Sequence, residues 1–214
     1  MKAFIFDLDG VLVSTDKYHY QAWKKMADDE GIYFDEKIND RLRGVSRMAS
    51  LGIVLERARR QYTEEEKVAL ANKKNDLYRD LLKNLTPADR LAGVTETLEK
   101  LRAEGFLLAV GSSSKNTPTI LDKIGYGGYF DAVSDGNNIT KSKPDPEVFV
   151  KAAEMLKLPA EECFVVEDAK AGIDAAKAGG FVSVGIGDVA DYDKTDYKIS
   201  TISDILKLPI LFNA

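Results

Sequence analysis

The sequence has few of the features of a secreted or membrane-bound protein. It contains a single cysteine, Cys163, among 214 residues, so an internal disulfide is impossible and a reducing compartment is expected. The first apolar run, at residues 3–6, is too short for a signal peptide, and no later run has the length of a membrane span. We therefore expect a cytoplasmic protein without a membrane anchor.

Excess positive charge is also missing. The formal net charge is -5 at pH 7, whereas nucleic-acid-binding proteins usually carry a basic surface. With 44% hydrophobic and 30% charged residues, the composition is that of an ordinary globular protein, long enough for one domain or two modest ones. We expect a monomer that binds neither nucleic acid nor membrane; a few local cations would suffice for a small anionic substrate.

What the sequence does contain is an alternation of short apolar runs and helical patterns. The apolar runs lie at residues 3–6, 106–110, 163–166 and 181–186. Continuous apolarity is typical of strands buried on both faces, as in a parallel sheet covered by helices. Helical periodicity appears at residues 94–104, 146–156 and 170–178. This order predicts an α/β, doubly wound (Rossmann-like), mostly parallel sheet, with ligands bound beyond the carboxyl ends of its strands.

One long stretch breaks the alternation. From about residue 16 to residue 84 the periodicity is helical, and no convincing strand occurs. Such a block is too long for an ordinary strand-to-strand connection. We predict an all-helical cap domain of residues 15–86 inserted into an α/β catalytic core of residues 1–14 and 87–214. The alternative is a helical decoration packed rigidly on the sheet; a mobile cap is favoured.

Carboxylates follow two of the predicted strands. Asp7 and Asp9 come after the first run, and Glu167 and Asp168 end the third. Aspartates at strand ends often only cap a helix, but two like charges as close as Asp7 and Asp9 are unfavourable unless a metal or a proton neutralises one. A cluster of carboxylate oxygens suits Mg²⁺, which also takes a phosphate oxygen. One carboxylate could act as a covalent nucleophile and the other could manage protons.

A serine-rich turn, Ser112–Asn116, ends the second run. It leads into a helix start, where backbone N–H groups and the helix dipole favour an anion, and Lys115 adds a positive charge. In isolation such a turn is more often a solvated loop with a helix cap. Its place next to the carboxylate cluster favours a phosphate site.

Together these motifs resemble the haloacid dehalogenase superfamily. They occur in order over nearly the whole chain: Asp7–Val11, the serine-ended second run, Lys143–Pro144 and Glu167–Asp168. The resemblance implies that Asp7 is the nucleophile and Asp9 the general acid/base. It also implies a Mg²⁺ ion held by Asp7, the backbone carbonyl of Asp9 and Asp168, with Glu167 in support. Ser112 and Lys143 would then clamp the transferred phosphoryl group.

Four segments narrow the resemblance: Tyr18–Trp23, Gly44–Arg47 and Lys74–Asp76 of the predicted cap, and the turn Ser112–Asn116. Together they resemble the β-phosphoglucomutase family, in which β-glucose 1-phosphate becomes glucose 6-phosphate through a bisphosphate. The resemblance implies that Arg47 binds the non-reacting phosphate, together with Lys115 and Asn116, a task suited to a guanidinium. The remaining substrate-binding and hinge residues that it implies are His19, Trp23, Gly44, Val45, Ser46, Ser50, Lys74, Asn75, Ser113 and Ser114.

Alternatives remain at two levels. Taken singly, Arg47 is explained as a solvated charge, Trp23 as a core ring and His19 as a packed histidine. For the whole chain, the alternatives are a sugar-phosphate phosphatase of the same superfamily and a non-catalytic phosphosugar-binding protein. Because no nucleophile or metal carboxylate is lost, the non-catalytic alternative is disfavoured. Ser14, Asp145 and Ala169 depart from the family pattern, where a carboxylate, an alanine and a serine are frequent.

Overall fold

The computed structural model describes residues 2–43 and 45–209. Its strands are β1 (Ala3–Phe6), β2 (Leu107–Gly111), β3 (Ala132–Ser134), β4 (Cys163–Glu167), β5 (Val182–Ile186) and β6 (Tyr197–Ile199). Its α-helices are α1 (Asp16–Asp29), α2 (Glu36–Asp40), α3 (Arg47–Leu55), α4 (Glu64–Leu82), α5 (Val94–Ala103), α6 (Thr117–Lys123), α7 (Glu147–Leu156) and α8 (Lys170–Ala178).

All six strands form one parallel sheet in the order β3-β2-β1-β4-β5-β6. The strand order reverses at β1, since the chain moves first to β2 and β3 and then returns to β4 on the other side. Phe6, the last residue of β1, pairs with both Val110 of β2 and Val166 of β4. The residues that follow these strands therefore meet at the switch point, where parallel sheets bind their ligands.

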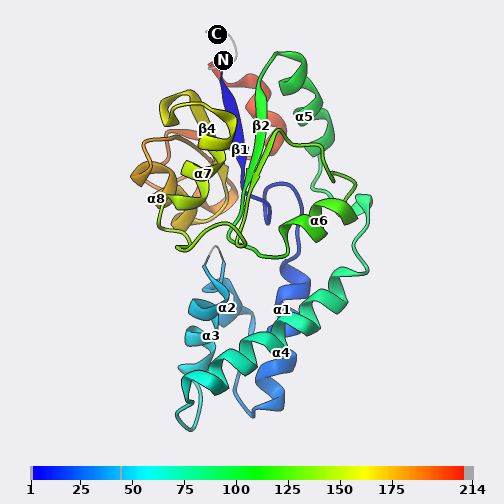
Figure 1. Cartoon of the computed structure of the whole chain (residues 1–214), viewed down its shortest axis with the longest axis vertical. Coiled ribbons are helices and arrows are strands. Elements are labelled where there is room, and N and C mark those ends of the chain that lie inside the picture. The colour runs from blue at the N-terminus through cyan, green and yellow to red at the C-terminus, as the bar shows by residue number, and fades with distance from the viewer. Residues whose placement is uncertain (1, 44, 210–214) are drawn as a thin grey trace.

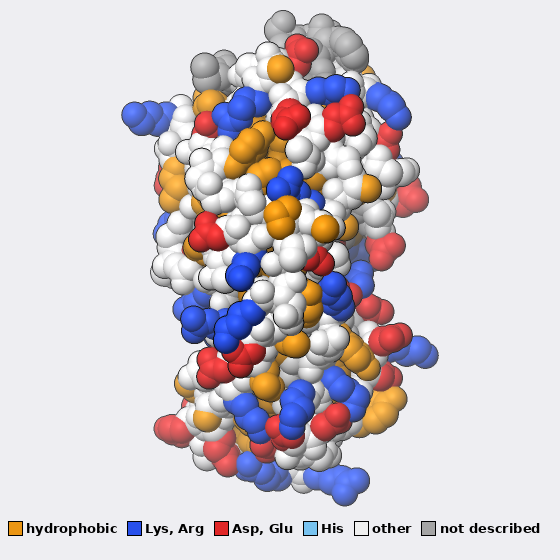
Figure 2. Space-filling view, turned by 90° about the vertical axis from the view of Figure 1, so that its right-hand side faces the viewer, with side chains coloured by type: hydrophobic (Ala, Val, Ile, Leu, Met, Phe, Trp, Pro, Cys, Tyr) orange, Lys and Arg blue, Asp and Glu red, His pale blue; other side chains and the backbone are white. Residues whose placement is uncertain are grey.

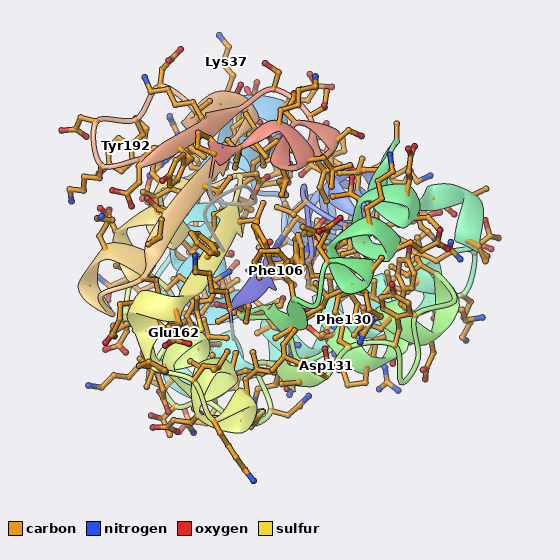
Figure 3. The ribbon with its side chains drawn as sticks, turned by 90° about the horizontal axis from the view of Figure 1, so that it is seen from above. Lys37, Phe106, Phe130, Asp131, Glu162 and Tyr192 are labelled. Atoms are coloured by element: carbon orange, nitrogen blue, oxygen red, sulfur yellow. The ribbon has the colours of Figure 1, made fainter. Side chains whose placement is uncertain are left out.

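Both faces of the sheet are buried. Phe4 and Phe6 of β1 face the cluster that includes α5, whereas Ile5 faces the cluster that includes α7 and α8. Each of these side chains is fully buried, which stabilises the fold by about 1.5–3 kcal/mol per side chain. Figure 3 looks down on this core, with Phe106 near the centre of the view and Glu162 and Tyr192 towards its edge. Burial on both faces explains why the strands lack polar alternation.

Helices α1 to α4 lie beyond the carboxyl ends of the strands (Figure 1). They have a hydrophobic core of their own, built around residues such as Trp23, Phe34 and Leu70. The longest, α4, starts with a capping box in which the Thr63 and Glu66 side chains bond each other's backbone N–H groups. The α/β sheet and the helical cap are thus confirmed; the domain limits at residues 14/15 and 86/87 stay a prediction.

Two strands were not predicted from the sequence. Both β3 and β6 have three residues, and each lies at an edge of the sheet, where short runs give little apolar signal. No helix of the described residues is long and apolar enough to cross a membrane. On the face drawn in Figure 2, acidic and basic side chains are interspersed.

Candidate active site

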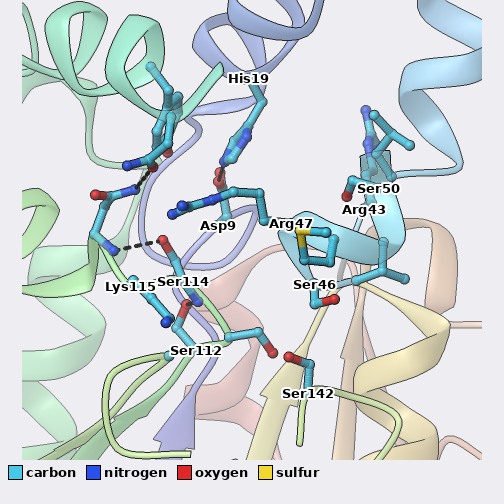
Figure 4. Close-up of a pocket in the computed structure, with 18 of the residues that line it drawn as sticks. Asp9, His19, Arg43, Ser46, Arg47, Ser50, Ser112, Ser114, Lys115 and Ser142 are labelled. Carbon is cyan, nitrogen blue, oxygen red and sulfur yellow. Dashed lines mark hydrogen bonds and ion pairs between the residues drawn. The ribbon is translucent and has the colours of Figure 1, made fainter. Parts of the chain in front are cut away.

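A cleft of about 550 Å³ lies between the sheet and the cap. Its walls come from the carboxyl ends of the strands on one side and from α1, α3 and α4 on the other. Figure 4 shows side chains of both sides, including Asp9 and Ser112 of the core and His19 and Arg47 of the cap, around this space.

Asp7, Lys143 and Glu167 form a buried ion-pair network at the sheet end of the cleft. Lys143 Nζ lies 2.5 Å from Asp7 Oδ1 and 2.5 Å from Glu167 Oε1. Burial alone would lower the pKa of Lys143, but the two carboxylates raise it above its usual value, so the ammonium stays charged. The peptide bond that follows, Lys143–Pro144, is cis. Removing the lysine would leave two buried carboxylates without a counter-charge, which is strongly destabilising.

Three carboxylates at this end could hold a cation. Ligand atoms of Asp7, Glu167 and Asp168 all lie within 4.8 Å of one another. Burial and neighbouring carboxylates raise the pKa of Asp168 to about 8, and burial raises that of Glu167 to about 7 despite Lys143. Negative charge this concentrated is relieved by a divalent ion, and oxygen-only donors suit Mg²⁺. The donor set therefore fits the metal that the sequence implied.

Two glycines make room for these carboxylates. A Cβ on Gly10, which has a φ of 84°, would come within 1.9 Å of Asp168 Oδ2. A Cβ on Gly172 of α8 would come within 1.9 Å of the Glu167 carboxylate. The free Glu167 oxygen accepts hydrogen bonds from the backbone N–H groups of Asp168 and Ala169, at 3.0 and 3.1 Å. Both oxygens of Glu167 therefore have hydrogen-bond partners, Lys143 for one and backbone N–H groups for the other. Only glycine fits at position 172, where α8 passes this carboxylate.

The Asp9 carboxylate points away from the three-carboxylate cluster, towards the start of the cap. It accepts hydrogen bonds from the backbone N–H of Thr15, at 2.7 Å, and from the Thr15 hydroxyl. The same hydroxyl lies 2.8 Å from the hydroxyl of Tyr78 in α4. Burial raises the pKa of Asp9 to about 6. A carboxyl group with such a pKa exchanges protons readily near neutral pH. The backbone carbonyl of Asp9 remains the predicted metal contact.

His19 and Lys74 extend this network into the cap. His19 Nε2 lies 3.5 Å from Asp9 Oδ2, and His19 Nδ1 lies 2.8 Å from Lys74 Nζ. Burial lowers the pKa of His19 well below its usual value, so the ring is neutral. Burial also lowers the pKa of Lys74 to about 7. With Nδ1 accepting from Lys74, the ring proton resides on Nε2 and faces Asp9.

The serine-rich turn is organised by its own hydroxyls. Ser112 Oγ accepts the backbone N–H of Ser114, and Ser114 Oγ accepts that of Asn116, at 3.2 and 3.1 Å. Each hydroxyl proton therefore remains available for an acceptor such as a phosphate oxygen. The Asn116 amide also donates to Asn75 Oδ1 of α4, at 3.0 Å, which links the turn to the cap.

Arg47 and Lys115 are the predicted cations for a second phosphate. Arg47 extends from α3 into the space between the cap and the serine-rich turn (Figure 4). Within residues 2–43 and 45–209, neither side chain forms an ion pair closer than 4.0 Å. Burial lowers the pKa of Arg47, although Asp76 opposes this. A half-buried guanidinium without a close counter-ion is suited to an incoming anion.

The structure gathers nearly all of the predicted site residues around the cleft. Glu167 is buried behind the wall rather than on it, and Gly44 lies outside the described residues. The remaining predicted residues line the cleft: Asp7, Asp9, His19, Trp23, Val45, Ser46, Arg47, Ser50, Lys74, Asn75, Ser112, Ser113, Ser114, Lys115, Asn116, Lys143 and Asp168.

Sequence reasoning missed several residues of the site. Thr15 and Tyr78 hold Asp9, and Arg43 lines the cleft while its guanidinium lies 3.0 Å from Asp16. A signal for Tyr78 was present, because it lies four residues after Lys74 in α4 and therefore on the same helix face. No such signal exists for Thr15, which lies only six positions from Asp9 but contacts Tyr78, 63 positions away.

The switch-point carboxylates, the buried lysine and the helical cap together define an enzyme of the phosphoryl-transfer type. The family model described as haloacid dehalogenase-like hydrolase matches residues 1–180, and the chain belongs to this family.

Its relatives include both mutases and phosphatases. β-Phosphoglucomutase of Bacillus subtilis (strain 168) is 41% identical over 207 residues, 96% of this chain and 92% of that protein. A phosphorylated carbohydrates phosphatase of Thermotoga maritima is 31% identical over 84% of this chain and 82% of its own length. Among solved structures, β-phosphoglucomutase from Clostridium difficile superposes with a TM-score of 0.92 at 35% identity, covering 100% of this chain and 97% of that one.

Proposed function

We propose that the protein is a β-phosphoglucomutase, which interconverts β-D-glucose 1-phosphate and glucose 6-phosphate through an aspartyl phosphate and glucose 1,6-bisphosphate. The observation that carries the proposal is a single cleft with cations at two places. Lys143 lies beside Asp7 at the sheet, and Arg47 and Lys115 line the same cleft without an ion pair to any described residue. This arrangement suits a substrate with a phosphate at each end, and the B. subtilis relative supports the same activity.

In the proposed mechanism Asp7 carries the phosphoryl group. A sugar hydroxyl attacks the phosphorus of phospho-Asp7, the bond from phosphorus to the Asp7 oxygen breaks, and Asp9 accepts the hydroxyl proton. The bisphosphate then reorients and returns its other phosphoryl group to Asp7, while Asp9 gives the proton to the departing sugar oxygen. Arg47, Lys115 and Asn116 hold the phosphate that is not reacting.

The charge that spreads over the phosphoryl oxygens during transfer needs compensation. Lys143 supplies a fixed positive charge from one side, and Ser112 donates its hydroxyl proton. We propose that Asp7, Asp168 and the Asp9 carbonyl hold Mg²⁺, supported by Glu167; when bound, the ion neutralises charge on the transferring group. Closure of the cap would keep water from the aspartyl phosphate.

A second candidate is a phosphatase for small sugar phosphates, which the T. maritima relative favours. It would use the same nucleophile, but water instead of a sugar would take the phosphoryl group. We also propose, as predictions that stand apart from the activity, a cytoplasmic monomer with the cap limits given above.

A coupled assay separates the two candidates. Glucose 6-phosphate and inorganic phosphate are measured in parallel from each glucose 1-phosphate anomer, with Mg²⁺ and a trace of glucose 1,6-bisphosphate. Glucose 6-phosphate from the β-anomer alone, dependent on the bisphosphate primer and abolished by a chelator, is the result expected. Stoichiometric phosphate release without glucose 6-phosphate would assign the protein to the phosphatases instead.

A further inference from the structure

Helix α7 holds the chain segment that leads to Lys143. Glu147, the first residue of α7, accepts three hydrogen bonds with Oε2: from the backbone N–H of Thr140 at 2.9 Å, from its hydroxyl at 2.9 Å, and from the backbone N–H of Lys141 at 2.7 Å. One turn later, Lys151 donates to the backbone carbonyl of Asn138 and lies 3.1 Å from Glu147 Oε1. Two side chains of one helix therefore hold both ends of residues 138–141.

This segment is part of the cleft wall. Ile139, Thr140, Ser142 and Lys143 all line the cleft, and Lys143 comes only two residues after Lys141. On the other side of Lys143, Asp145 Oδ1 accepts the backbone N–H of Glu147 at 3.0 Å. The loop that contains Lys143 is thus hydrogen-bonded to the start of α7 on both sides of the lysine.

The helix itself is fixed to the sheet. Val148 and Phe149, which follow Glu147 directly, are fully buried in the cluster that contains Ile5 of β1. The Lys143 ammonium lies 4.7 Å from the Phe149 ring centroid. Packing thus fixes α7 to the sheet, and hydrogen bonds fix the loop that carries Lys143 to α7. In this position Lys143 Nζ contacts Asp7 and Glu167 together.

We infer that Glu147, assisted by Lys151, is a positioning residue that holds Lys143 in place for phosphoryl transfer. The inference rests on the role given to Lys143 in the proposed function. The hydrogen bonds, led by that from the Lys141 backbone, lower the pKa of Glu147 to about 2, so its carboxylate remains charged at neutral pH. The competing explanation is that an acidic residue in the first turn only stabilises α7 through the helix dipole.

The test compares Glu147→Gln, Glu147→Asp, Lys151→Met and the control Glu154→Gln. Asp keeps the charge at the start of α7 but is one methylene too short for the three donors, so it distinguishes positioning from helix stabilisation. Glu154 is exposed on the same helix, two turns further on. Circular dichroism and thermal unfolding establish that each variant is folded.

Two readouts are used for every variant. The first is turnover of β-glucose 1-phosphate, with kcat and KM determined separately. The second is the affinity of the Mg²⁺-loaded protein for trifluoroberyllate, an analogue of the aspartyl phosphoryl group, followed by ¹⁹F NMR. Amide hydrogen exchange at Thr140 and Lys141 reports whether the segment has been released.

We expect Glu147→Gln and Glu147→Asp to lower kcat roughly tenfold with little change in KM, because a displaced charge acts on the transition state. Trifluoroberyllate binding should weaken by a similar factor, and the two amides should exchange faster. Lys151→Met should give a smaller loss, and Glu154→Gln should match wild type. Wild-type kcat and trifluoroberyllate affinity in Glu147→Gln, or full recovery in Glu147→Asp, would overturn the inference. Failure of the wild-type protein itself to bind trifluoroberyllate would instead refute the role of Asp7 and Lys143.

Discussion

The two ends of the cleft differ in how their charges are balanced. At the sheet, Lys143 contacts two carboxylates at 2.5 Å, and backbone N–H groups satisfy the rest of Glu167. At the cap, Arg47 has no ion pair among the described residues, and Lys74 faces a neutral histidine. The buried lysine of the sheet end is thus held in ion pairs without substrate, with Asp168 left to share in metal binding, whereas the cap end offers a cation without a close counter-ion among the described residues. The sheet end is suited to a reaction whose catalytic groups are held in fixed positions. The cap end is suited to binding an anion that enters and leaves.

Asp7→Asn should have the largest effect, because it removes the proposed nucleophile at the sheet end. We expect turnover to fall by roughly four orders of magnitude, measured as glucose 6-phosphate formation and as phosphate release. Lys143 keeps Glu167 as a partner, so the variant should still fold. Asp28→Asn, on the exposed face of α1, is the control. Substantial phosphate release by Asp7→Asn would mean that another group attacks the phosphorus.

Arg47→Ala should distinguish the function of the cap end of the cleft from that of the sheet end. Loss of a charge-assisted contact to the second phosphate is expected to lower mutase turnover roughly a hundredfold, while slow phosphate release from Asp7 persists. Arg47→Lys should recover only part of the loss, because an ammonium cannot bind two oxygens in a fork. Arg79→Ala, an exposed arginine of α4, serves as the control. Normal isomerisation by Arg47→Ala would refute a cap-bound phosphate.

Gly172→Ala should test how tightly the sheet end is packed. The new methyl group would overlap the Glu167 carboxylate, so we expect the free energy of unfolding to fall by about 3 kcal/mol, with loss of activity as Lys143 loses one of its two partners. Gly52 of α3 has no atom within 4 Å of its added Cβ. Gly52→Ala should therefore stabilise the protein slightly. Chemical denaturation measures both; equal effects of the two substitutions would contradict the close contact at Gly172.

Lys74→Met should change stability in a way that depends on pH. The folded protein holds the pKa of Lys74 at about 7, below its value of 10.5 in a free side chain. Between pH 7 and pH 10 the unfolded chain therefore binds more protons at this position, so the wild type gains stability as pH rises. Methionine lacks this dependence.

The stability advantage of Lys74→Met over wild type should thus shrink between pH 7 and pH 10, by on the order of 3 kcal/mol. Thermal unfolding at both pH values measures the difference, in which the titration of groups distant from Lys74 cancels between the two proteins. Lys67→Met, which alters a surface ion pair with Glu64 of the same helix, is the control. A difference that does not vary with pH would show that the Lys74 side chain is protonated equally in both states.

Much of the sheet end was predictable from short stretches of sequence. A strand followed at once by Asp7 and Asp9, and another that ends at Glu167, implied one shared edge of a parallel sheet. The two strands missed, β3 and β6, have three residues each, too few for an apolar run to stand out. Strand limits shifted by only a residue or so, as with β2, which begins at Leu107 rather than Phe106.

The partners of these residues were less predictable. Gly172 passes Glu167 only because α8 packs back on β4, and Thr15 meets Tyr78 only because α1 and α4 lie side by side. The contacts of Glu147 with Thr140 and Lys141 are close in sequence, but a carboxylate at a helix start has an ordinary explanation as a dipole partner. The inference that these contacts position Lys143 depends on the place of Lys143 in the cleft, which only the tertiary structure gives.

Local order along the chain by itself determined the fold class and the helical cap, and it indicated where candidate site residues lie, because burial on both faces and strand-end polarity are properties of neighbouring residues. Tertiary structure alone decided which charges are balanced. Distance and burial determine that Lys143 pairs with two carboxylates, that Arg47 pairs with none among the described residues, and that the pKa of Lys74 is lowered. Electrostatic energies vary with both, and neither is set by spacing along the chain.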